Sequence, residues 1–536
     1  DLIETRTRWV EGGDFIQTAG ISPSGARAVF EARGDIVTVP AEKGSVRILT
    51  RTSGVHERSP AWSPDGSRIA FFSDASGEYR LHIGPADDLS AARDYEIDGA
   101  GFYDDPKWSP DGEWVSFTDN SRSVWVAEVG SGDMTRVGSQ PIYGPLDNVN
   151  HTWSPDSRWL AYTLDDENSI GKLYVFSTET GESRQIETSL GHLTSPAFDR
   201  SGKYLYLYAS TDAGPVQSWF DMSNNDTESR GTLYMAILDP SLPSPLAPES
   251  DEVAVAEDGE GDAGSEDEPA GDADERSDED EAVEVEWDEL AQRVVPLGVG
   301  SGWFTGLAAG EEGQLFYLRR SSSGPAGGPP SLRRFDPSAQ EETTLLPGAG
   351  GFQVSADGTK LLINAGGNAH IAPAGPPVEA DETRIATDDI RIQVEPREEW
   401  GQMLREIWRQ QRDWFYDPDM HGADWDAMWD KYAAFLPDLA TRADLNRVTQ
   451  WMLSELAVGH SGGGGGDFIR DAESVPSGLL GADFEVADGR WRFERIYQGE
   501  NWNPNLRSPL AEPGMNIQEG DYLLAVNGEP LNAPDN

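Results

Sequence analysis

Ser-Pro-Asp-Gly at residues 63–66, followed by the apolar run Ile-Ala-Phe-Phe at residues 69–72, decides the fold class of this chain. Proline presets φ at the second position of a tight turn, aspartate caps the turn, and glycine takes the positive φ that such turns require. An apolar run directly after a turn is typical of the second strand of a hairpin. The unit therefore predicts a turn that leads into a buried strand.

This unit occurs seven times before residue 370, five times clearly and twice in degenerate form. The turn segments are residues 22–25, 63–66, 109–112, 154–157, 199–202, 308–313 and 355–358. The first four begin at residues 22, 63, 109 and 154, so the steps between them are 41, 46 and 45 residues. One four-stranded propeller blade takes roughly 40–50 residues. We therefore expect a mainly β chain with a seven-bladed β-propeller over residues 1–380.

The charge of the chain excludes one class of partner. Among 536 residues there are 95 Asp and Glu against 41 Lys and Arg, which gives a net charge of −54. A surface of this sign repels the phosphate backbone, so no nucleic acid is expected as a partner. Acidity with only six lysines suits concentrated salt, where self-repulsion is screened, and indicates a halophilic source.

Part of the acidity lies in one run between the fifth and sixth units. The segment from Glu249 to Glu289 holds 21 acidic residues and one Arg. We interpret it as a disordered, solvated insertion in a blade loop at about residues 245–290, with a binding tail as the alternative.

The chain has no cysteine, which excludes disulfides, thiolate catalysis and cysteine-ligated metals. Its seven histidines show no clustered metal-ligand spacing, so neither a metal site nor a cofactor is predicted. No apolar run is long enough to predict a membrane span. Because the chain starts at Asp1 without Met and stops at Asn536 just after a β-rich run, we expect both ends to belong to something longer.

A helical pattern follows the repeats, and we expect a helical domain over residues 390–475. An apolar helical period runs from Pro396 to Phe415, a second helix follows the loop at residues 417–422, and a third opens with the capping-box pattern Thr441-x-x-Asp444. The module ends at residues 458–461 (Val-Gly-His-Ser), which five glycines follow.

His460 is the main candidate for chemistry in this module. A histidine between a helix end and a flexible glycine run can serve as a general base, although it can also merely cap the helix C-terminus. His421 lies in the loop after the first helix, where a hydrogen-bonding role within the loop is the favoured interpretation. Residues 459–463 match the G-x-S-x-G nucleophile elbow around Ser461, but an elbow needs a strand before it and a helix after it. No histidine follows residue 460, so we interpret this match as fortuitous and disfavour an α/β-hydrolase.

A third region, residues 476–536, returns to a β pattern. It opens with Gly478, Leu479, Leu480 and Gly481 and later carries an apolar strand closed by Asn527-Gly528, which is a hairpin signal.

The order of these regions resembles the tricorn protease family of serine peptidases. The residues that carry the likeness are specific: Trp-Phe-Tyr-Asp-Pro at 414–418, His-Gly-x-x-Trp-Asp-Ala-Met at 421–428, Tyr432, Arg-x-Asp-Leu-Asn at 442–446, Met-Leu-Ser-Glu-Leu at 452–456, and His460 with the glycine run to Asp467. The resemblance implies the second propeller, the helical domain and a C-terminally incomplete PDZ-like domain. It also implies that the nucleophilic Ser and its Glu partner belong to a downstream α/β domain.

The resemblance assigns roles to the candidate residues. His460 matches the general base of the family, which takes the proton from the Ser hydroxyl and later gives it to the leaving amine. Family members often carry a Ser directly before this histidine, where this chain has Gly459, so Ser461 is the candidate for orienting it, with a water molecule as the alternative. Gly478, Leu479, Leu480 and Gly481 are similar to the loop that receives a peptide carboxylate in PDZ domains, and a PDZ-like domain kept only as a spacer is the alternative.

The expected function is therefore that of a tricorn-like serine peptidase acting on short peptides, with this chain alone inactive. The alternative is a non-catalytic peptide-binding scaffold of propeller plus PDZ-like domain. The resemblance further implies a homo-oligomer, a hexamer in this family. It implies a cytoplasmic location, with a periplasmic or secreted one as the alternative if a signal peptide lies upstream of Asp1.

Overall fold

The computed structural model describes residues 2–98, 101–141, 149–168, 170–188, 190–211, 231–246, 285–311, 313–320, 328–467, 478–503 and 506–534. Most of the expected acidic insertion, residues 247–284, lies outside these described residues. The chain divides into two compact units, Asp1–Asp467 and Phe468–Asn536, and each is described by itself. Among the described residues, no helix combines the length and the apolar character that crossing a membrane requires.

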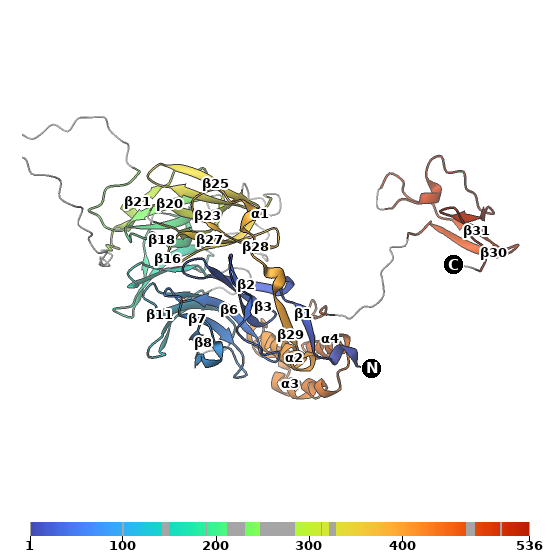
Figure 1. The fold of residues 1–536 in the computed structure, drawn as a ribbon, viewed down its shortest axis with the longest axis horizontal. Coiled ribbons are helices and arrows are strands. Elements are labelled where there is room, and N and C mark those ends of the chain that lie inside the picture. Colours follow the sequence, from blue (N-terminus) through green and yellow to red (C-terminus); the bar gives the residue numbers. More distant parts are fainter. Residues whose placement is uncertain are drawn as a thin grey trace, which may run out of the picture. The chain divides into compact units, whose positions relative to one another are not determined.

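The first unit is built from successive antiparallel sheets, each formed by consecutive strands (Figure 1). Within the described residues there are six four-stranded sheets and one three-stranded sheet between residues 16 and 373. The mainly β class and the repeated, propeller-like sheets are thereby confirmed. Each predicted turn lies between the first and second strands of its sheet.

The strands of the first four sheets are β2 (Ile16–Ile21), β3 (Arg27–Ala32), β4 (Asp35–Pro40), β5 (Arg47–Ile48); β6 (Glu57–Trp62), β7 (Arg68–Ser73), β8 (Arg80–Pro85), β9 (Arg93–Tyr95); β10 (Tyr103–Trp108), β11 (Trp114–Asp119), β12 (Ser123–Glu128), β13 (Met134–Ser139); and β14 (His151–Trp153), β15 (Trp159–Asp165), β16 (Gly171–Ser177), β17 (Ser183–Ile186). The last three sheets contain β18 (His192–Phe198), β19 (Tyr204–Ser210), β20 (Thr232–Ile237), β21 (Val294–Pro296); β22 (Trp303–Ala309), β23 (Leu315–Arg320), β24 (Ser331–Asp336), β25 (Glu341–Pro347); and β26 (Ala349–Val354), β27 (Lys360–Ala365), β28 (Asn368–Pro373).

The turn between β6 and β7 shows the chemistry that its sequence predicts. The hydroxyl of Ser63 donates to Asp65 Oδ1 at 2.5 Å, and the same carboxylate accepts from the main-chain N–H of Ser67 at 3.0 Å. Gly66 has φ of +74°, the left-handed conformation that glycine adopts without steric cost. In the fourth copy, Ser157 takes the equivalent conformation with φ of +61°.

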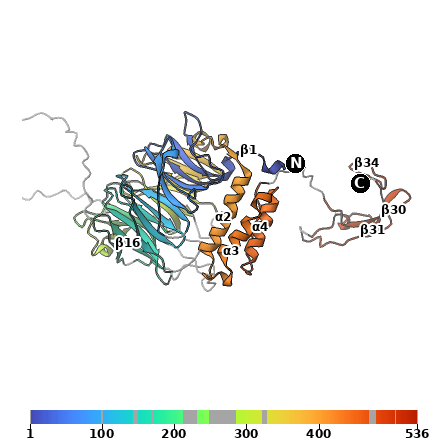
Figure 2. The same ribbon diagram turned by 90° about the horizontal axis from the view of Figure 1, so that it is seen from below.

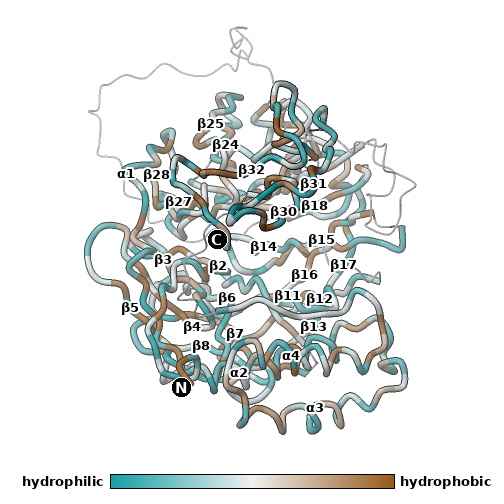
Figure 3. The backbone as a smooth tube through the Cα atoms, turned by 90° about the vertical axis from the view of Figure 1, so that its right-hand side faces the viewer, coloured by the Kyte–Doolittle hydropathy of each residue, from teal (hydrophilic) through white to brown (hydrophobic). Residues whose placement is uncertain are grey.

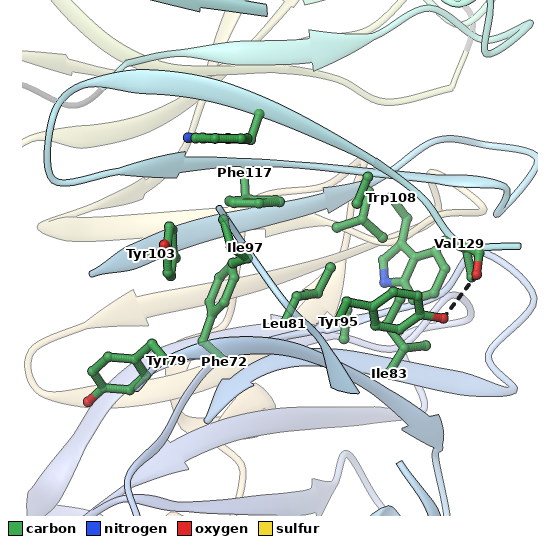
Figure 4. Packing of buried hydrophobic residues seen from close by; sticks show 14 of the residues in the cluster. Phe72, Tyr79, Leu81, Ile83, Tyr95, Ile97, Tyr103, Trp108, Phe117 and Val129 are labelled. Atoms are coloured by element: carbon green, nitrogen blue, oxygen red, sulfur yellow. Dashed lines mark hydrogen bonds between the residues drawn. The ribbon is translucent and has the colours of Figure 1, made fainter. Parts of the chain in front are cut away.

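Neighbouring sheets pack face to face through large side chains. Between the second and third sheets, Phe72 and Leu81 meet Tyr103 and Phe117 in one buried cluster (Figure 4). The Tyr95 hydroxyl, at the edge of this cluster, donates to the carbonyl oxygen of Val129 at 2.9 Å. Burial of such aromatic surfaces between sheets provides the main stabilisation of the repeat.

The first strands of most successive sheets lie beside one another, as β2 beside β6 and β18 beside β22, and the last sheet returns to the first through β26 and β2. Gln353 of β26 donates to the carbonyl oxygen of Ala19 at 2.8 Å, and the N–H of Asp357 donates to that of Pro23 at 3.0 Å. No described strand is shared between the first and last sheets. The two ends of the repeat are instead joined by a separate ribbon, in which β1 (Arg8–Glu11) pairs antiparallel with β29 (Arg391–Val394).

The helical module follows this ribbon and packs beside the propeller (Figure 2). After the short α1 (Ala380–Thr383), it consists of α2 (Pro396–Trp414), α3 (Trp425–Ala433) and α4 (Arg442–Ser454). Hydrophobic and hydrophilic residues alternate along these helices (Figure 3), and their apolar faces meet around buried tryptophans. The indole N–H of Trp408 donates to the carbonyl oxygen of Trp425 at 2.8 Å, and that of Trp425 donates back at 2.9 Å.

The second unit carries a small three-stranded antiparallel sheet in the order β30-β31-β32. Its strands are β30 (Ala482–Ala487), β31 (Arg490–Ile496) and β32 (Tyr522–Leu523), and a separate ribbon pairs β33 (Ala525–Val526) with β34 (Glu529–Pro530). Asn527 and Gly528 join this ribbon with φ of +52° and +87°. This confirms the hairpin that the Asn-Gly signal predicts.

Candidate functional site

Helix α4 leads to the candidate base and begins as the sequence predicts. The Thr441 hydroxyl accepts from the N–H of Asp444 at 3.2 Å, and the Asp444 carboxylate accepts from the N–H of Thr441 at 2.9 Å. This reciprocal pair is the predicted capping box, and it satisfies donors that the first turn of a helix leaves unpaired. On the inner face of the helix, Leu445, Val448 and Met452 are buried in the core of the module.

Beyond Ser454 the chain makes a tight turn before it reaches His460. The N–H groups of Glu455, Leu456 and Ala457 donate to carbonyls of the last helical turn at 3.1–3.2 Å. The Leu456 side chain is fully buried, and Ala457 then adopts the left-handed region with φ of +50°. His460 follows, exposed to solvent, also with positive φ, at +58°.

The His460 imidazole makes no hydrogen bond or ion pair with the described residues of the chain. The helix-capping role considered for His460 is taken by His421, whose Nδ1 lies 2.8 Å from the carbonyl oxygen of Leu456. Within its own loop, the N–H of His421 donates to Asp417 Oδ2 at 3.0 Å, which confirms the hydrogen-bonding role predicted for this residue. His460 is left as a solvent-facing imidazole, which is the state in which a base can accept a proton from a neighbouring group.

Ser461 directly follows and is likewise exposed. No hydrogen bond joins its hydroxyl to the His460 ring in this part of the structure, so its orienting role stays a prediction. The segment from 461 to 467 has no helical residues, and helix α4 precedes it. This arrangement lacks both elements of a nucleophile elbow, which needs a strand before the serine and a helix after it.

The glycine segment after Ser461 lies along helix α4 and is held there by two side-chain amides. Gln450 donates to the carbonyl oxygen of Gly463 at 3.3 Å, and Asn446, one helical turn earlier, donates to that of Gly465 at 2.9 Å. A side chain at Gly466 would place its Cβ 2.5 Å from the Arg442 guanidinium carbon, and φ there is +102°. The close approach of this segment to the helix therefore requires glycine.

The far end of the glycine segment is fixed to the propeller. The Asp467 carboxylate pairs with Arg33 Nη2 at 2.6 Å and with Arg8 Nη2 at 3.3 Å. The segment with His460 thus spans from the core of the helical module to an ion pair on the first sheet.

Helix α2 is joined to the second sheet by further ion pairs, of which the one made by Arg409 is buried. The Arg409 guanidinium, 1% exposed, pairs with Asp74 and, at 2.7 Å, with Glu406. Arg412 pairs with both carboxylate oxygens of Glu78 at 2.8 Å. These contacts fix the orientation of the module, and so of His460, relative to the propeller.

Two carboxyl groups beside this interface are buried with few compensating charges. Burial raises the pKa of Glu57 to about 8, and the charges of Asp35 and Asp74 add to the effect. Burial likewise raises the pKa of Asp35 to about 6. Threonine hydroxyls stabilise the ionised form of Glu57, with Thr52 Oγ1 2.7 Å from Glu57 Oε1.

In the second unit, the residues predicted to bind a peptide carboxylate form an exposed loop just before the edge strand β30. Leu479 is 90% exposed and Leu480 is 41% exposed. Gly481 has φ of +76°, and its carbonyl oxygen accepts from the N–H of Tyr497 at 2.8 Å. The loop backbone N–H groups and the unpaired side of β30 are the two features that strand addition by a peptide needs.

Several residues of the site escaped prediction. The sequence gives no sign that Arg33 contacts Asp467 or that His421 contacts Leu456, because the partners are far apart in the chain. Asn446 and Gln450 carry a recognisable signal, since amides four residues apart share one face of a helix. Within the described residues, no group of three or more His, Cys, Asp or Glu side chains is arranged to hold a metal ion.

Comparison with protein-family models gives three matches. Residues 16–375 match the tricorn protease second beta propeller domain, residues 396–454 match the tricorn protease C1 domain, and residues 478–536 match the tricorn protease PDZ domain.

Individual relatives agree with the domain matches. Tricorn protease homolog 1 of Streptomyces coelicolor is 30% identical over 366 residues, which cover 63% of this chain and 32% of the relative. The tricorn protease of Thermoplasma acidophilum is 25% identical over 376 residues, 68% of this chain and 32% of the relative. The chain therefore spans about a third of the length of these curated relatives.

The fold agrees as well. A solved structure described as the crystal structure of the tricorn protease superposes with a TM-score of 0.75 at 19% identity, covering 98% of this chain and 49% of that one. Since one family model alone matches more than half of the residues, the chain belongs to the tricorn protease family.

Proposed function

We propose that this chain is part of a tricorn-like serine peptidase that degrades short peptides, with His460 as the general base. The observation that carries the proposal is the placement of His460: an exposed imidazole without a partner among the described residues, on a segment anchored at both ends, in a chain of the tricorn protease family. Acyl transfer needs a base that is free to bind a hydroxyl proton and rigid enough to be aimed.

In the proposed reaction, the His460 imidazole takes the proton from the hydroxyl of a serine that a further segment supplies. The serine oxygen attacks the peptide carbonyl, and the imidazolium then gives its proton to the leaving amine. The Ser461 hydroxyl, adjacent to the base in the chain, is proposed to orient the ring. No metal or cofactor takes part in these steps.

The proposal assigns the chain to three domains. Residues 1–380 form a seven-bladed propeller with the acidic insertion at about 245–290, residues 390–475 form the helical domain, and residues 476–536 form the PDZ-like domain. The loop Gly478, Leu479, Leu480 and Gly481 would receive the carboxylate of a peptide. We further propose homo-oligomeric assembly, a halophilic source and action in the cytoplasm, with a periplasmic or secreted location as the alternative.

The test compares this chain with a polypeptide extended to the natural stop codon of its gene. Each is made as wild type, as His460→Ala and as Ser454→Ala, a matched control on the exposed surface at the end of α4. Fluorophosphonate labelling and cleavage of fluorogenic peptides are measured in concentrated KCl. We expect activity from the extended wild type and the control, none from the shorter chain, and loss of turnover in His460→Ala.

A second candidate function, peptide binding without catalysis, is favoured by one feature of the second unit. An exposed loop, similar to the loop that binds a peptide carboxylate in PDZ domains, lies beside the edge strand β30. In this alternative the chain is a non-catalytic scaffold that binds peptides, and His460 is idle. An extended chain that binds peptides but neither labels nor cleaves would favour it. Labelling of the shorter chain at Ser461 would contradict both readings.

A further inference from the structure

The loop that carries His421 is strained and tightly held. Its two central residues, Met420 and His421, have φ of +51° and +54°, the left-handed region that costs energy for residues other than glycine. The Asp417 carboxylate accepts from the N–H groups of Asp419 at 3.1 Å and His421 at 3.0 Å, and the Met420 side chain is buried in the module core. Such strain persists only where the surroundings enforce it, and it marks positions with a role.

Both ring nitrogens of His421 are engaged. Nδ1 lies 2.8 Å from the carbonyl oxygen of Leu456, and a carbonyl only accepts, so Nδ1 carries the proton. Nε2 lies within hydrogen-bond distance of the Tyr416 hydroxyl. The Phe415 ring packs edge-on against the imidazole with ring centroids 5.1 Å apart. A histidine with both nitrogens occupied is suited to hold a structure in place rather than to move protons.

His421 binds the carbonyl group of Leu456, which lies where the chain leaves helix α4. Carbonyls at the C-terminal end of a helix lack intrahelical partners and need an outside donor. Three residues of this turn continue the backbone hydrogen bonding of the helix, and the Leu456 carbonyl is then taken by His421. Ala457 turns the chain into the left-handed region directly afterwards, and His460 lies three residues beyond it.

The segment between Ala457 and Gly462 is therefore a short loop pinned at both ends. Its first end is fixed by the bond from His421 to Leu456, and its second end by the bond from Gln450 to Gly463. His460 lies within this loop, and its own side chain contributes no hydrogen bond in the described structure. Its position depends on these two anchors.

We propose that His421 is a positioning residue for His460: by donating from Nδ1 to the Leu456 carbonyl, it fixes the backbone that aims the His460 imidazole. The inference rests on the proposed function of His460 as the general base. It assigns to His421 no contact with substrate and no transfer of a proton.

The experiment uses two nearly isosteric substitutions, His421→Asn and His421→Asp. The Asn amide nitrogen can take the place of Nδ1 and donate to Leu456, whereas the ionised Asp carboxylate cannot donate. Both residues tolerate the left-handed backbone better than most, so the pair differs in the donor and not in backbone strain. Amide hydrogen exchange of the full 536-residue chain is followed at Leu456 and Ala457, whose N–H groups donate to carbonyl oxygens at the end of α4, with strand β7 as an internal reference for correct folding.

We expect His421→Asp to speed exchange at Leu456 and Ala457 by about tenfold, the effect of losing one hydrogen bond that restrains a local opening, and His421→Asn to keep exchange slow. Exchange that stays slow in the Asp variant overturns the inference. So does equal loosening in both variants, because it would show that ring packing rather than the hydrogen bond holds the loop.

The link to catalysis is tested separately in the polypeptide extended to its natural stop codon. There we expect His421→Asp to lower kcat with KM unchanged and His421→Asn to recover most of the loss. If the Asp variant loosens the loop but turnover survives even in His460→Ala, the role of His460 as the base is wrong and the positioning of a base fails with it. If His460→Ala abolishes turnover while loosening leaves kcat intact, only the positioning role of His421 is overturned.

Discussion

Arg33 and Asp467, which are 434 positions apart in the chain, form an ion pair with Nη2 and Oδ2 separated by 2.6 Å. The same guanidinium binds Glu399 of helix α2, with Nε 2.6 Å from Oε1 and Nη2 2.9 Å from Oε2. The side chains of Arg33 and Glu399 are only 8% and 10% exposed. One buried cation therefore joins the propeller, the helical module and the end of the segment that carries His460.

Replacing this cation by a neutral side chain of similar length is expected to destabilise the first unit. Arg33→Met leaves Glu399 buried without its partner, and breaking a buried pair in this way costs about 3 kcal/mol. The measurement is the free energy of unfolding in urea at constant salt, followed by tryptophan fluorescence. Arg391→Met is the control, because its pair with Glu11 is 48% and 73% exposed and contributes less than about 1 kcal/mol. Equal losses in the two variants would contradict the anchoring role of Arg33.

The repeat and the helices could be predicted from sequence because their signals are local. The turn Ser63-x-Asp65-Gly66 contains within four residues the hydroxyl, the carboxylate and the glycine that its hydrogen bonds and positive φ use. The capping box of Thr441 and Asp444 is likewise complete within one helical turn. In both cases the residues that make the contact are the residues that make the pattern.

The contacts that fix the site could not be predicted in this way. Strand β1, near the start of the chain, pairs with β29 more than 350 residues later. Each strand has four residues, which is too short for a periodicity that would predict the pairing. The position of His460 depends on hydrogen bonds to the carbonyl groups of Leu456 and Gly463. Every residue has a main-chain carbonyl, so the sequence does not indicate which ones accept such bonds. Nor does the helical period show that Trp414, which is 43% exposed at the end of α2, has its ring centroid 4.8 Å from that of Phe102 on the propeller.

The buried Glu57 is expected to make stability depend on pH. Its pKa is about 8 in the folded protein and about 4.5 in an unfolded chain, because burial disfavours the charged form. Between these values the folded state binds more protons, so the free energy of unfolding falls as pH rises. The favourable contribution is complete below about pH 4.5 and lost above about pH 8, and its size is on the order of 4 kcal/mol.

The variant Glu57→Gln tests this dependence. Glutamine keeps an acceptor for Thr52 but has no proton to lose, so its stability should decline less than that of the wild type between pH 5 and pH 9. Thermal unfolding across this range measures the difference. Glu42→Gln, in the loop between β4 and β5 of the first sheet, changes an exposed side chain and should leave the slope of the wild type unaltered. Parallel curves for the wild type and Glu57→Gln would show that Glu57 does not titrate in this range.

The capping box of α4 is expected to stabilise the helix that precedes the candidate base. Thr441→Ala removes the acceptor for the N–H of Asp444, and losing an N-cap of this kind costs about 1 kcal/mol. Thr441→Ser keeps the hydroxyl and should retain most of the stability. Urea unfolding measures both. Equal losses in the Ala and Ser variants would assign the effect to packing of the threonine methyl group instead of the cap.

Peptide binding by the second unit is expected to depend on a free carboxylate. A peptide that adds to β30 would place its C-terminus at the loop from Gly478 to Gly481, where backbone N–H groups can donate to both oxygens. Charge-assisted bonds of this kind are stronger than neutral ones, so the C-terminal amide of the same peptide should bind at least about tenfold more weakly. A labelled hexapeptide ending in Ala-Ala-Phe and its amide, titrated into the full chain by fluorescence anisotropy, measure the difference.

Gly481→Ala tests whether the loop itself binds the peptide, and Gly489→Ala is its control. At φ of +76° an alanine is strained, and its Cβ would lie 2.8 Å from Ser508 Oγ, so the loop must shift. Gly489→Ala, in the turn between β30 and β31, has similar φ of +72° but no atom within 4 Å of the new Cβ. We expect weaker binding of the free-acid peptide in the first variant and not in the second. If both variants bind like the wild type, or if the amide binds as tightly as the acid, the loop is not the carboxylate site and the second unit acts as a spacer.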